Sequence, residues 1–488
     1  MICRMIPERL AKVVRATRPI LCILVFVVWS PHSAAAQEGR EPDWNKFDAE
    51  TLQHYQALLR LDTSSPPGRE TQAVEYLSNV LKKDGIEVAV YASEPDRANL
   101  VARIKGNGSK RPLLIMGHTD VVTVDPTKWS HPPFGAVRDG GYIYGRGTID
   151  DKDNLVASLM VMLTLKRQRV PLDRDVIFVA ESGEEGGSNV GASFLTSAHL
   201  PTIDAEYCFA EGGNVRIEGG QARFAAIQTL EKHARTVEFT ARGASGHASV
   251  PLESNAIAHL SAALAAVTAW QAPIRLNATT HAYFERLASL SEPGRAARYR
   301  AVLNPGSTDA AEALAFFLKA EPGHASMLHT SVSPTVLSSG YRVNVIPSDA
   351  TATLDARMLP DEDPDAFLEV LRKVVNDPAV VVSYGPRVEK PRAATGGGLD
   401  SDVFKILEAG VTKHYSVPTI PQMSTGGTDM SFLRAKGIQC FGIGPATDVE
   451  DVAKGYGAHS DQERLRESEL YRFVHFNWDI VIKTAKAK

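Results

Sequence analysis

Three short apolar segments, each ending directly before a histidine or an acidic residue, constrain the fold of this chain most strongly. Residues 112–117, 175–180 and 207–210 are almost continuously apolar, which is typical of strands buried on both faces of a sheet. Residues 69–84 and 154–166 have helical spacing. Strands that alternate with helices predict an α/β fold with a mixed, largely parallel sheet flanked by helices.

The pattern changes near residue 229, where a second unit is predicted. Residues 236–241 alternate between polar and apolar side chains, as in a half-exposed antiparallel strand. Further strands are predicted at 341–345, 350–357 and 379–383, with helices at 256–270 and 363–374. The first pattern returns near residue 391. We therefore predict a main domain of residues 37–228 and 391–488, interrupted by a smaller α+β domain at 229–390.

The first 36 residues form a separate segment. Five basic residues between Arg4 and Arg18 precede the apolar run 20–29, and small residues follow at 33–36. This order predicts a signal peptide cleaved after Ala36, and a secreted or periplasmic protein. A membrane anchor is the alternative, although a span needs about 20 apolar residues and this run is shorter. No other segment is long enough to cross a membrane.

Charge and cysteine content narrow the classes of partner. The chain has a formal net charge of −4, and loss of the basic leader would make it more acidic. An acidic protein does not suggest a nucleic-acid partner. Cys208 and Cys440 remain after cleavage, each inside an apolar run, which predicts buried free thiols. A single disulfide between them is the alternative in an oxidising compartment.

Acidic residues and histidines gather where the predicted strands end. One pair follows strand 112–117, another follows strand 175–180, and single acids follow strand 207–210 and the short strand 142–144. Because the carboxyl ends of strands in an open α/β sheet converge on one crevice, these side chains should share a pocket. They are His118, Asp120, Asp150, Glu184, Glu185 and Glu211.

Five carboxylates in one pocket would repel one another and take up protons. Two divalent cations remove this conflict and leave a positive centre that can hold a hydroxide near neutral pH and polarise a carbonyl. Histidine and carboxylate ligands suit zinc. The alternative is a set of solvated loop acids, but scattered surface acids need not follow strand ends. A second histidine is needed, and His459 is the candidate.

Five motifs resemble those of the M20 metallopeptidases, a family that includes carboxypeptidase G, succinyl-diaminopimelate desuccinylase, aminoacylase and carnosinase. The motifs are residues 117–122, 144–152, 184–187, 211–213 and 459–460, in matching order and with fitting spacing. The resemblance covers roughly residues 50–480. It implies a hydrolase that cuts an amide bond with two zinc ions, for which cobalt or manganese could stand in.

The resemblance also implies the metal ligands. His118, Asp150 and Glu211 would hold one zinc ion, and Asp150 would bridge to the other, which Glu185 and His459 would complete. A water that bridges the two ions would attack the amide carbonyl.

Two further residues of this cluster receive roles from the family. Asp120 would hydrogen-bond to the His118 ring and fix its tautomer. Glu184 would be the general base, taking a proton from the water and passing one to the leaving nitrogen. Asp153 departs from the small residue that the family often has at this position.

The inserted domain resembles the lid or dimerisation domain of the family. His247 matches the histidine that polarises the scissile carbonyl and holds the oxyanion, often from the neighbouring subunit. Asn344 matches a substrate-binding residue, and Arg357 the arginine that grips a substrate carboxylate. Gly426 and Thr428 match a glycine loop at the substrate end. The local alternatives are a turn histidine, a strand-end cap, a surface salt bridge and a solvent turn.

Together these residues predict a hydrolase for small peptides or N-acyl amino acids with a free α-carboxylate. Closure of the lid would bring its residues to the substrate and exclude water, and the lid could form a homodimer. The long segment 276–332 is similar to the branch of Gly-X carboxypeptidases and N-acyl amino acid hydrolases. Two alternatives stand beside this reading: an M28-like aminopeptidase without a lid, and a non-catalytic periplasmic binding protein, which would not need Glu184.

Overall fold

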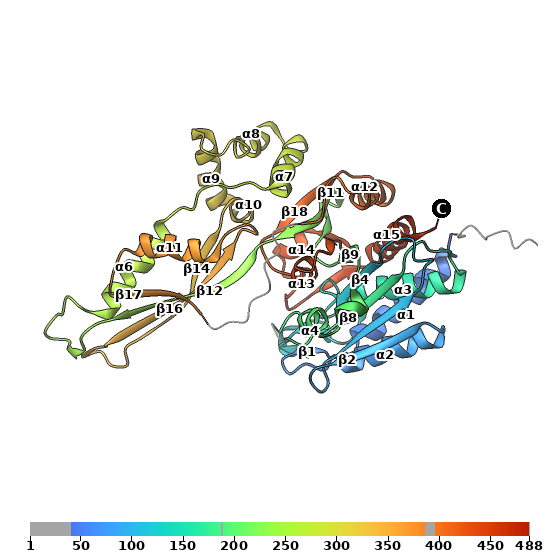
Figure 1. Cartoon of the computed structure of the whole chain (residues 1–488), viewed down its shortest axis with the longest axis horizontal. Coiled ribbons are helices and arrows are strands. Elements are labelled where there is room, and N and C mark those ends of the chain that lie inside the picture. Colours follow the sequence, from blue (N-terminus) through green and yellow to red (C-terminus); the bar gives the residue numbers. More distant parts are fainter. Residues whose placement is uncertain (1–40, 187–188, 386–395, 488) are drawn as a thin grey trace, which may run out of the picture. The chain divides into compact units, whose positions relative to one another are not determined.

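The computed structural model describes residues 41–186, 189–385 and 396–487. The predicted signal peptide and the domain boundary at residues 390–391 therefore lie outside the described residues. The largest sheet has ten strands in the order β2-β3-β8-β4-β9-β19-β11-β10-β20, with β18 paired to β11 (Figure 1). These strands are β2 (Glu87–Ala92), β3 (Ala98–Ile104), β4 (Leu113–His118), β8 (Val176–Glu181), β9 (Tyr207–Ala210), β10 (Asn214–Glu218), β11 (Gln221–Glu231), β18 (Thr419–Ser424), β19 (Gln439–Gly442) and β20 (Ala446–Asp448).

The middle of this sheet is parallel. β8, β4, β9 and β19 run in the same direction, whereas β2 and β3 at one end and β10 and β11 at the other pair antiparallel. The sheet is thus mixed, with its parallel strands at the centre, and the predicted fold class is confirmed.

Helices cover both faces of the sheet, which explains why its strands are continuously apolar. Leu113 and Ile115 of β4 belong to one core with the helices α1 (Trp44–Leu59), α3 (Lys152–Gln168) and α15 (Glu467–Ala485). Leu114 and Met116 belong to a second core with α4 (Ala192–Ala198) and α13 (Met430–Arg434). Because successive side chains of a strand point to opposite faces, each set of alternate residues needs its own apolar partners.

Helix α3 is buried on every side along its first 14 residues. It lies between the sheet and the helices α1 and α15 (Figure 1), and a helix that is apolar all round is expected in such a position. The N-terminal end of α3 follows directly after Asp150 and Asp151. The burial of α3 therefore fixes the place of these two acids.

A second sheet of four antiparallel strands lies within the inserted part of the chain. Its order is β14-β16-β12-β17, and α6 and α11 pack on it through a separate core. We call these elements the four-stranded unit. They are β12 (His233–Arg242), α6 (Ala256–Ala269), β14 (Ser331–Ser339), β16 (Asp349–Met358), α11 (Pro364–Val375) and β17 (Val380–Tyr384).

The long segment 276–332 is helical and packs against the large sheet. It forms α7 (Ala278–Ser289), α8 (Pro293–Ala301), α9 (Thr308–Ala320) and α10 (Pro322–Leu328). Their shared core includes Leu230 of β11 together with Ile420 and Met423 of β18. These helices thus bury the edge of the large sheet at β18.

One predicted strand is wrong. Residues 340–344 form a turn after β14, and only β15 (Val345–Ile346) pairs, with the short β13 (Gly246–His247). Among the described helices, none has the length and apolar character needed to cross a bilayer. The remaining elements are β1 (Ser64–Ser65), α2 (Thr71–Lys83), β5 (Val121–Val122), the 3-10 helix η1 (Pro126–Lys128), β6 (Val137–Asp139), β7 (Tyr142–Tyr144), α5 (Leu200–Ile203), α12 (Asp402–Tyr415), α14 (Val449–Ala453) and β21 (Arg464–Arg466).

Candidate active site

The ends of the parallel strands bring the first predicted residues together. His118 ends β4 and lies opposite Glu181, which ends the neighbouring β8. Glu211 follows β9 on the other side of β4. The convergence expected at the carboxyl edge of the sheet is therefore present for these strands.

Asp150 reaches the same place by a path that differs from the prediction. β7, the strand before it, belongs to a separate three-stranded sheet with β6 and β21 and not to the large sheet. The loop that follows β7 leads to the start of α3, and Asp150 Oδ1 lies 2.9 Å from His118 Nε2. The position of Asp150 depends on this loop and on α3 rather than on a strand end.

A buried ion pair holds this loop against the segment that carries His459. Glu463 pairs with Arg146 and accepts the backbone N–H of Ile149 at 2.8 Å. Arg146 also donates to the backbone oxygen of Ser460 at 2.9 Å. The sequence reading missed both roles. The available signal was an arginine between two glycines just before Asp150, and an acid shortly after His459.

Asp150 lies between two histidines, each with a glutamate of its own. Its Oδ1 is 2.9 Å from His118 Nε2, and its Oδ2 is 3.0 Å from His459 Nε2. Glu211 Oε2 lies 4.0 Å from His118 Nε2, and Glu185 Oε1 lies 2.8 Å from His459 Nε2. With Glu184, these residues form what we call the acidic centre: His118, Asp150, Glu184, Glu185, Glu211 and His459.

The donor atoms of the acidic centre are spaced as metal ligands are. Ligand atoms of His118, Asp150 and Glu185 lie within 4.8 Å of one another, and so do those of His118, Glu184 and Glu211. Two ligand atoms that bind the same zinc ion at about 2.0–2.1 Å lie roughly 3.3 Å apart when the geometry is tetrahedral. Because both groups share His118, they mark a place beside this ring where imidazole and carboxylate donors lie close enough to hold a divalent cation.

The electrostatics of the acidic centre favour the same ions. Burial raises the pKa of Glu211 well above its usual range, and the nearby Glu184 adds to this effect. Hydrogen bonds to Asp150 and Glu185 raise the pKa of His459 to about 10. Burial opposes ionisation of Asp150, yet its hydrogen bonds to the two imidazoles hold its pKa below the usual range. Protons thus hold the acids and histidines together, and a cation can take their place.

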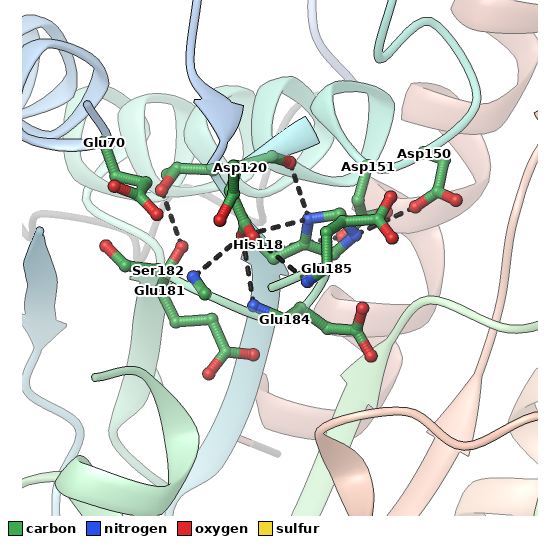
Figure 2. Close-up of polar contacts among 12 residues, drawn as sticks. Glu70, His118, Asp120, Asp150, Asp151, Glu181, Ser182, Glu184 and Glu185 are labelled. Atoms are coloured by element: carbon green, nitrogen blue, oxygen red, sulfur yellow. Dashed lines mark hydrogen bonds and ion pairs between the residues drawn. The ribbon is translucent and has the colours of Figure 1, made fainter. Parts of the chain in front are cut away.

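Asp120 positions the two glutamates. Its carboxylate accepts the backbone N–H groups of Gly183, Glu184 and Glu185 at 2.9, 3.1 and 3.0 Å (Figure 2). His118 Nδ1 lies 2.9 Å from the backbone oxygen of Asp120, closer than the 3.6 Å to its carboxylate. The main chain of Asp120 orients the His118 ring, while its side chain fixes the turn that carries Glu184 and Glu185.

Asp151 differs from its neighbour Asp150. It is fully buried, and its carboxylate accepts the backbone N–H of His118 at 3.1 Å and the side-chain amide of Asn154 at 2.6 Å. Asp151 therefore fastens the end of β4 to the start of α3. Asp150 is the member of the pair that lies between the two histidines, as the family pattern implies.

The predicted lid residues lie in the four-stranded unit and beside it. His247 pairs with Val345, and the backbone oxygen of Asn344 accepts the N–H of Ala248 at 3.1 Å, so His247 and Asn344 are neighbours. Both side chains are exposed. Arg357 of β16 pairs with Asp355 through two hydrogen bonds of 2.7 and 3.1 Å. The side-chain hydrogen bonds of His247 and Arg357 run to Ser249 and Asp355, within the inserted part.

The glycine loop after β18 is tied to the end of β11. Gly426 donates its backbone N–H to the Ser424 hydroxyl at 3.1 Å. Thr428 is buried, and its N–H and hydroxyl both donate to Glu231, at 2.8 and 2.7 Å. The Thr428 hydroxyl is thus engaged within the protein.

The two cysteines lie side by side in the large sheet. Cys208 of β9 is paired with Cys440 of β19, and both are buried free thiols, as predicted.

Comparison with known proteins decides the family. A sequence model of the family described as "Peptidase family M20/M25/M40" matches residues 114–481 of this chain. The chain belongs to this family. It is 26% identical to a probable carboxypeptidase S-like 2 of Dictyostelium discoideum, over 80% of this chain and 75% of that protein. It is 25% identical to the N-fatty-acyl-amino acid synthase/hydrolase PM20D1 of Xenopus tropicalis, over 75% of this chain and 71% of that protein.

The fold is that of solved members of the family. The crystal structure of an M20 family metallo-carboxypeptidase from Sulfolobus solfataricus matches with a TM-score of 0.66 at 20% identity, covering 88% of this chain and 98% of that one. The M20 chain is a metallopeptidase, a hydrolase that acts on amide bonds. This family membership decides against the M28-like aminopeptidase and against the non-catalytic binding protein.

Proposed function

We propose that this M20 hydrolase uses two zinc ions to cut the amide bond of small peptides or N-acyl amino acids that carry a free α-carboxylate. The observation that carries the proposal is the position of Asp150, which offers one oxygen to His118 and the other to His459, at 2.9 and 3.0 Å. A carboxylate shared in this way suits two adjacent cations. Cobalt or manganese could occupy the same ligands.

The ligands divide into two sets around Asp150. His118 and Glu211 would complete one site, and Glu185 and His459 the other, in keeping with the distances within each pair. When bound, the two cations supply Lewis acidity to the scissile carbonyl and to the attacking water.

Glu184 is the general base in this proposal. It takes a proton from the water as the oxygen–carbon bond forms, and it returns a proton to the leaving nitrogen as the carbon–nitrogen bond breaks. Asp120 supports this role because it grips the backbone N–H of Glu184 as well as those of both neighbours. Glu184 and Glu185 are adjacent in one turn, so their side chains can point in different directions. In this proposal Glu184 transfers the proton and Glu185 binds a cation.

The inserted domain 229–390 is proposed to close over the substrate. Closure would present His247 to the oxyanion, Asn344 to the substrate and Arg357 to its α-carboxylate, and would exclude water. Gly426 and Thr428 would line the substrate end through their backbone. The relatives named above support this substrate class, because one is a carboxypeptidase-like protein and the other acts on N-fatty-acyl amino acids.

A homodimer through the four-stranded unit is part of the proposal. β14 is an edge strand, and its Val336 and Leu337 side chains are 58% and 67% exposed. An exposed edge with apolar side chains is a surface that a second chain can cover. We also propose a secreted or periplasmic location after cleavage behind Ala36, supported by the order of basic, apolar and small residues in 1–36.

Metal analysis combined with a substrate panel tests the function. We expect about two zinc ions per chain by elemental analysis, and hydrolysis of dipeptides or N-acyl amino acids that disappears on chelation. Glu184→Gln should keep the metal and lower kcat by about 10²- to 10⁴-fold. A wild-type chain that binds no divalent cation, or a Glu184→Gln variant with full turnover, would contradict the proposal.

A further inference from the structure

A cavity beside the helices of segment 276–332 lies apart from the acidic centre. Its volume is about 560 Å³, within the usual size of ligand pockets, about 300–1,000 Å³. Its walls come from β10, β11, α7, α8, α10 and the turns that follow α7 and precede β18. The cavity that Asp150 and Glu211 line is built from a different set of residues. We call the first one the helix-side cavity.

The helices that form the helix-side cavity are fastened to the large sheet. Arg286 of α7 donates to the backbone oxygen of Thr419 at 3.0 Å and pairs with Glu408 of α12 at 2.6 Å. Leu287 of α7 belongs to the same apolar core as Ile420 of β18. The walls are therefore held by side-chain contacts as well as by the chain connections, as is usual for a preformed ligand site.

A hydrogen-bond network forms the buried wall of this cavity. His324 Nδ1 lies 2.6 Å from Glu321, and its Nε2 lies 3.1 Å from the Tyr283 hydroxyl. Tyr299 donates to Glu321 at 3.0 Å, and Arg295 donates to it at 2.8 Å. Burial lowers the pKa of His324, so the ring is neutral near pH 7 and accepts at Nε2. Because these groups satisfy one another, this wall presents mainly aromatic surface to a ligand.

A β-bulge brings an arginine to the cavity. Ala222 and Phe224 of β11 pair with the adjacent residues Ile217 and Arg216 of β10, which leaves Arg223 as the extra residue between them. A bulge of this kind changes the direction of a side chain. Arg223 is exposed and lines the cavity together with Phe224. Its guanidinium has no hydrogen-bond or ion-pair partner among the described residues.

Glu292 is the acidic counterpart of Arg223. It precedes α8, is exposed and lines the same cavity. Its carboxylate, too, is without an ion pair or hydrogen bond within residues 41–186, 189–385 and 396–487. The other charged residues of the lining are engaged: Arg216 pairs with Glu218 at 2.6 Å, and Arg295 belongs to the network described above. The cavity therefore presents one cation and one anion that are available to a ligand.

Much of the remaining lining is apolar. It includes Leu287, Leu290, Val417 and Pro418, next to the ring of Phe224. Leu290 is 47% exposed, so an apolar ligand that covers it removes a leucine side chain from water, which is favourable. The cavity thus suits an apolar body that carries one positive and one negative group.

We propose that the helix-side cavity is a second ligand site and that it binds an apolar amino acid as the free zwitterion. The α-carboxylate pairs with Arg223, the α-ammonium pairs with Glu292, and the apolar side chain covers Leu290. An apolar acid without an amino group would leave Glu292 unmatched, and an apolar amine would leave Arg223 unmatched. The inference does not depend on the proposed function, because binding at this site is measured without turnover.

Titration calorimetry on the metal-loaded wild-type enzyme tests the class of ligand. L-Phenylalanine is compared with three molecules that each lack one of its groups: 3-phenylpropanoate lacks the ammonium, 2-phenylethylamine lacks the carboxylate, and glycine lacks the ring. We expect L-phenylalanine to bind and each of the others to bind about tenfold more weakly, since a hydrogen bond to a charged group contributes about this much.

Two variants locate the site. Arg223→Met should weaken L-phenylalanine about tenfold and leave 2-phenylethylamine unchanged, whereas Glu292→Gln should weaken L-phenylalanine and leave 3-phenylpropanoate unchanged. A purely structural effect would weaken all of these ligands together. Arg300→Met and Glu285→Gln are the matched controls, because both residues are exposed on α8 and α7 and lie outside the lining. Both controls should bind L-phenylalanine as the wild type does.

Three results would overturn the proposal. The first is a wild-type enzyme that does not bind L-phenylalanine. The second is an affinity for 3-phenylpropanoate or 2-phenylethylamine equal to that for L-phenylalanine, which would mean that the zwitterion is not recognised. The third is an affinity for L-phenylalanine that either Arg223→Met or Glu292→Gln leaves unchanged, which would place the ligand elsewhere, for example at the acidic centre.

Discussion

The acidic centre and the inserted part of the chain hold their polar residues in opposite ways. At the acidic centre, His118 is buried, and its hydrogen bonds join residues that are distant in sequence, such as Asp150 and Asp151. In the inserted part, His247 is exposed, and its ring accepts from the hydroxyl and N–H of Ser249, only two residues away.

This difference indicates which part of the site is preformed. The acidic centre has its side chains fixed by the fold before any ligand binds, so little ordering remains when cations and substrate arrive. His247 and Arg357 make their side-chain hydrogen bonds within the inserted part, so the catalytic role proposed for them would depend on closure over the substrate. Variants in the two regions should therefore fail differently: the first in metal binding and turnover, the second in turnover alone.

The largest effect is expected at Asp150. Asp150→Asn replaces one of the two oxygens that face His118 and His459 with an amide N–H₂ group, which cannot bind a cation, so we expect loss of both cations and turnover at background level. The thermal unfolding midpoint of the variant should also stop responding to added zinc, since only a bound ligand stabilises the fold. Elemental analysis and a thermal melt measure both effects.

The neighbouring Asp151 provides the control for Asp150. Asp151→Asn can still accept the His118 N–H, because an amide oxygen replaces the carboxylate oxygen, so we expect it to retain metal. If Asp150→Asn bound two zinc ions as tightly as the wild type, the bridging role would be disproved, and with it the contrast between the two regions.

A smaller effect with the opposite pattern is expected at His247. His247→Ala should lower kcat by about 10²- to 10³-fold, the usual loss for one oxyanion donor, while the metal content stays at the wild-type value. His259→Ala is the matched control, because His259 lies in the same inserted part of the chain and pairs with Asp377. A loss of metal in His247→Ala would show instead that the inserted part helps to build the acidic centre.

Some positions in the acidic centre could be predicted from the sequence and others could not. His118, Glu185 and Glu211 could be placed together because His118 ends an apolar strand, Glu211 directly follows one and Glu185 comes four residues after another, and neighbouring parallel strands end at one edge of a sheet. The path of Asp150 could not, because the three-residue β7 pairs with β21, which lies more than 300 residues further along the chain. The position of Asp150 therefore depends on contacts that no local pattern records.

In the inserted part, the prediction of strands from the apolar pattern failed for a different reason. The edge strand β14 was missed, and a strand was predicted instead at residues 341–345, where Tyr341 and Val343 are 83% and 97% exposed. Pattern reading assumes that apolar residues are buried, and it fails where an apolar surface is left exposed. A dimer interface or a closing lid needs such an exposed apolar surface. The wrong strand at residues 341–345 is therefore predicted where this region would contact a second chain or the substrate.

The smallest loss of activity is expected for a substitution at Asp120. An amide at this position has one oxygen for the three backbone N–H groups that the carboxylate now accepts, and its own N–H₂ faces donors. Asp120→Asn should therefore loosen the turn of Glu184 and Glu185 and lower metal affinity or kcat/KM by about 10- to 100-fold. Because the main-chain oxygen of Asp120 lies nearest to His118, the loss should fall on the cation of Glu185 and His459 rather than on that of His118. Spectra of cobalt titrated into the variant can distinguish the two sites, and a selective loss at His118 would mean that the carboxylate acts through the imidazole instead of the turn.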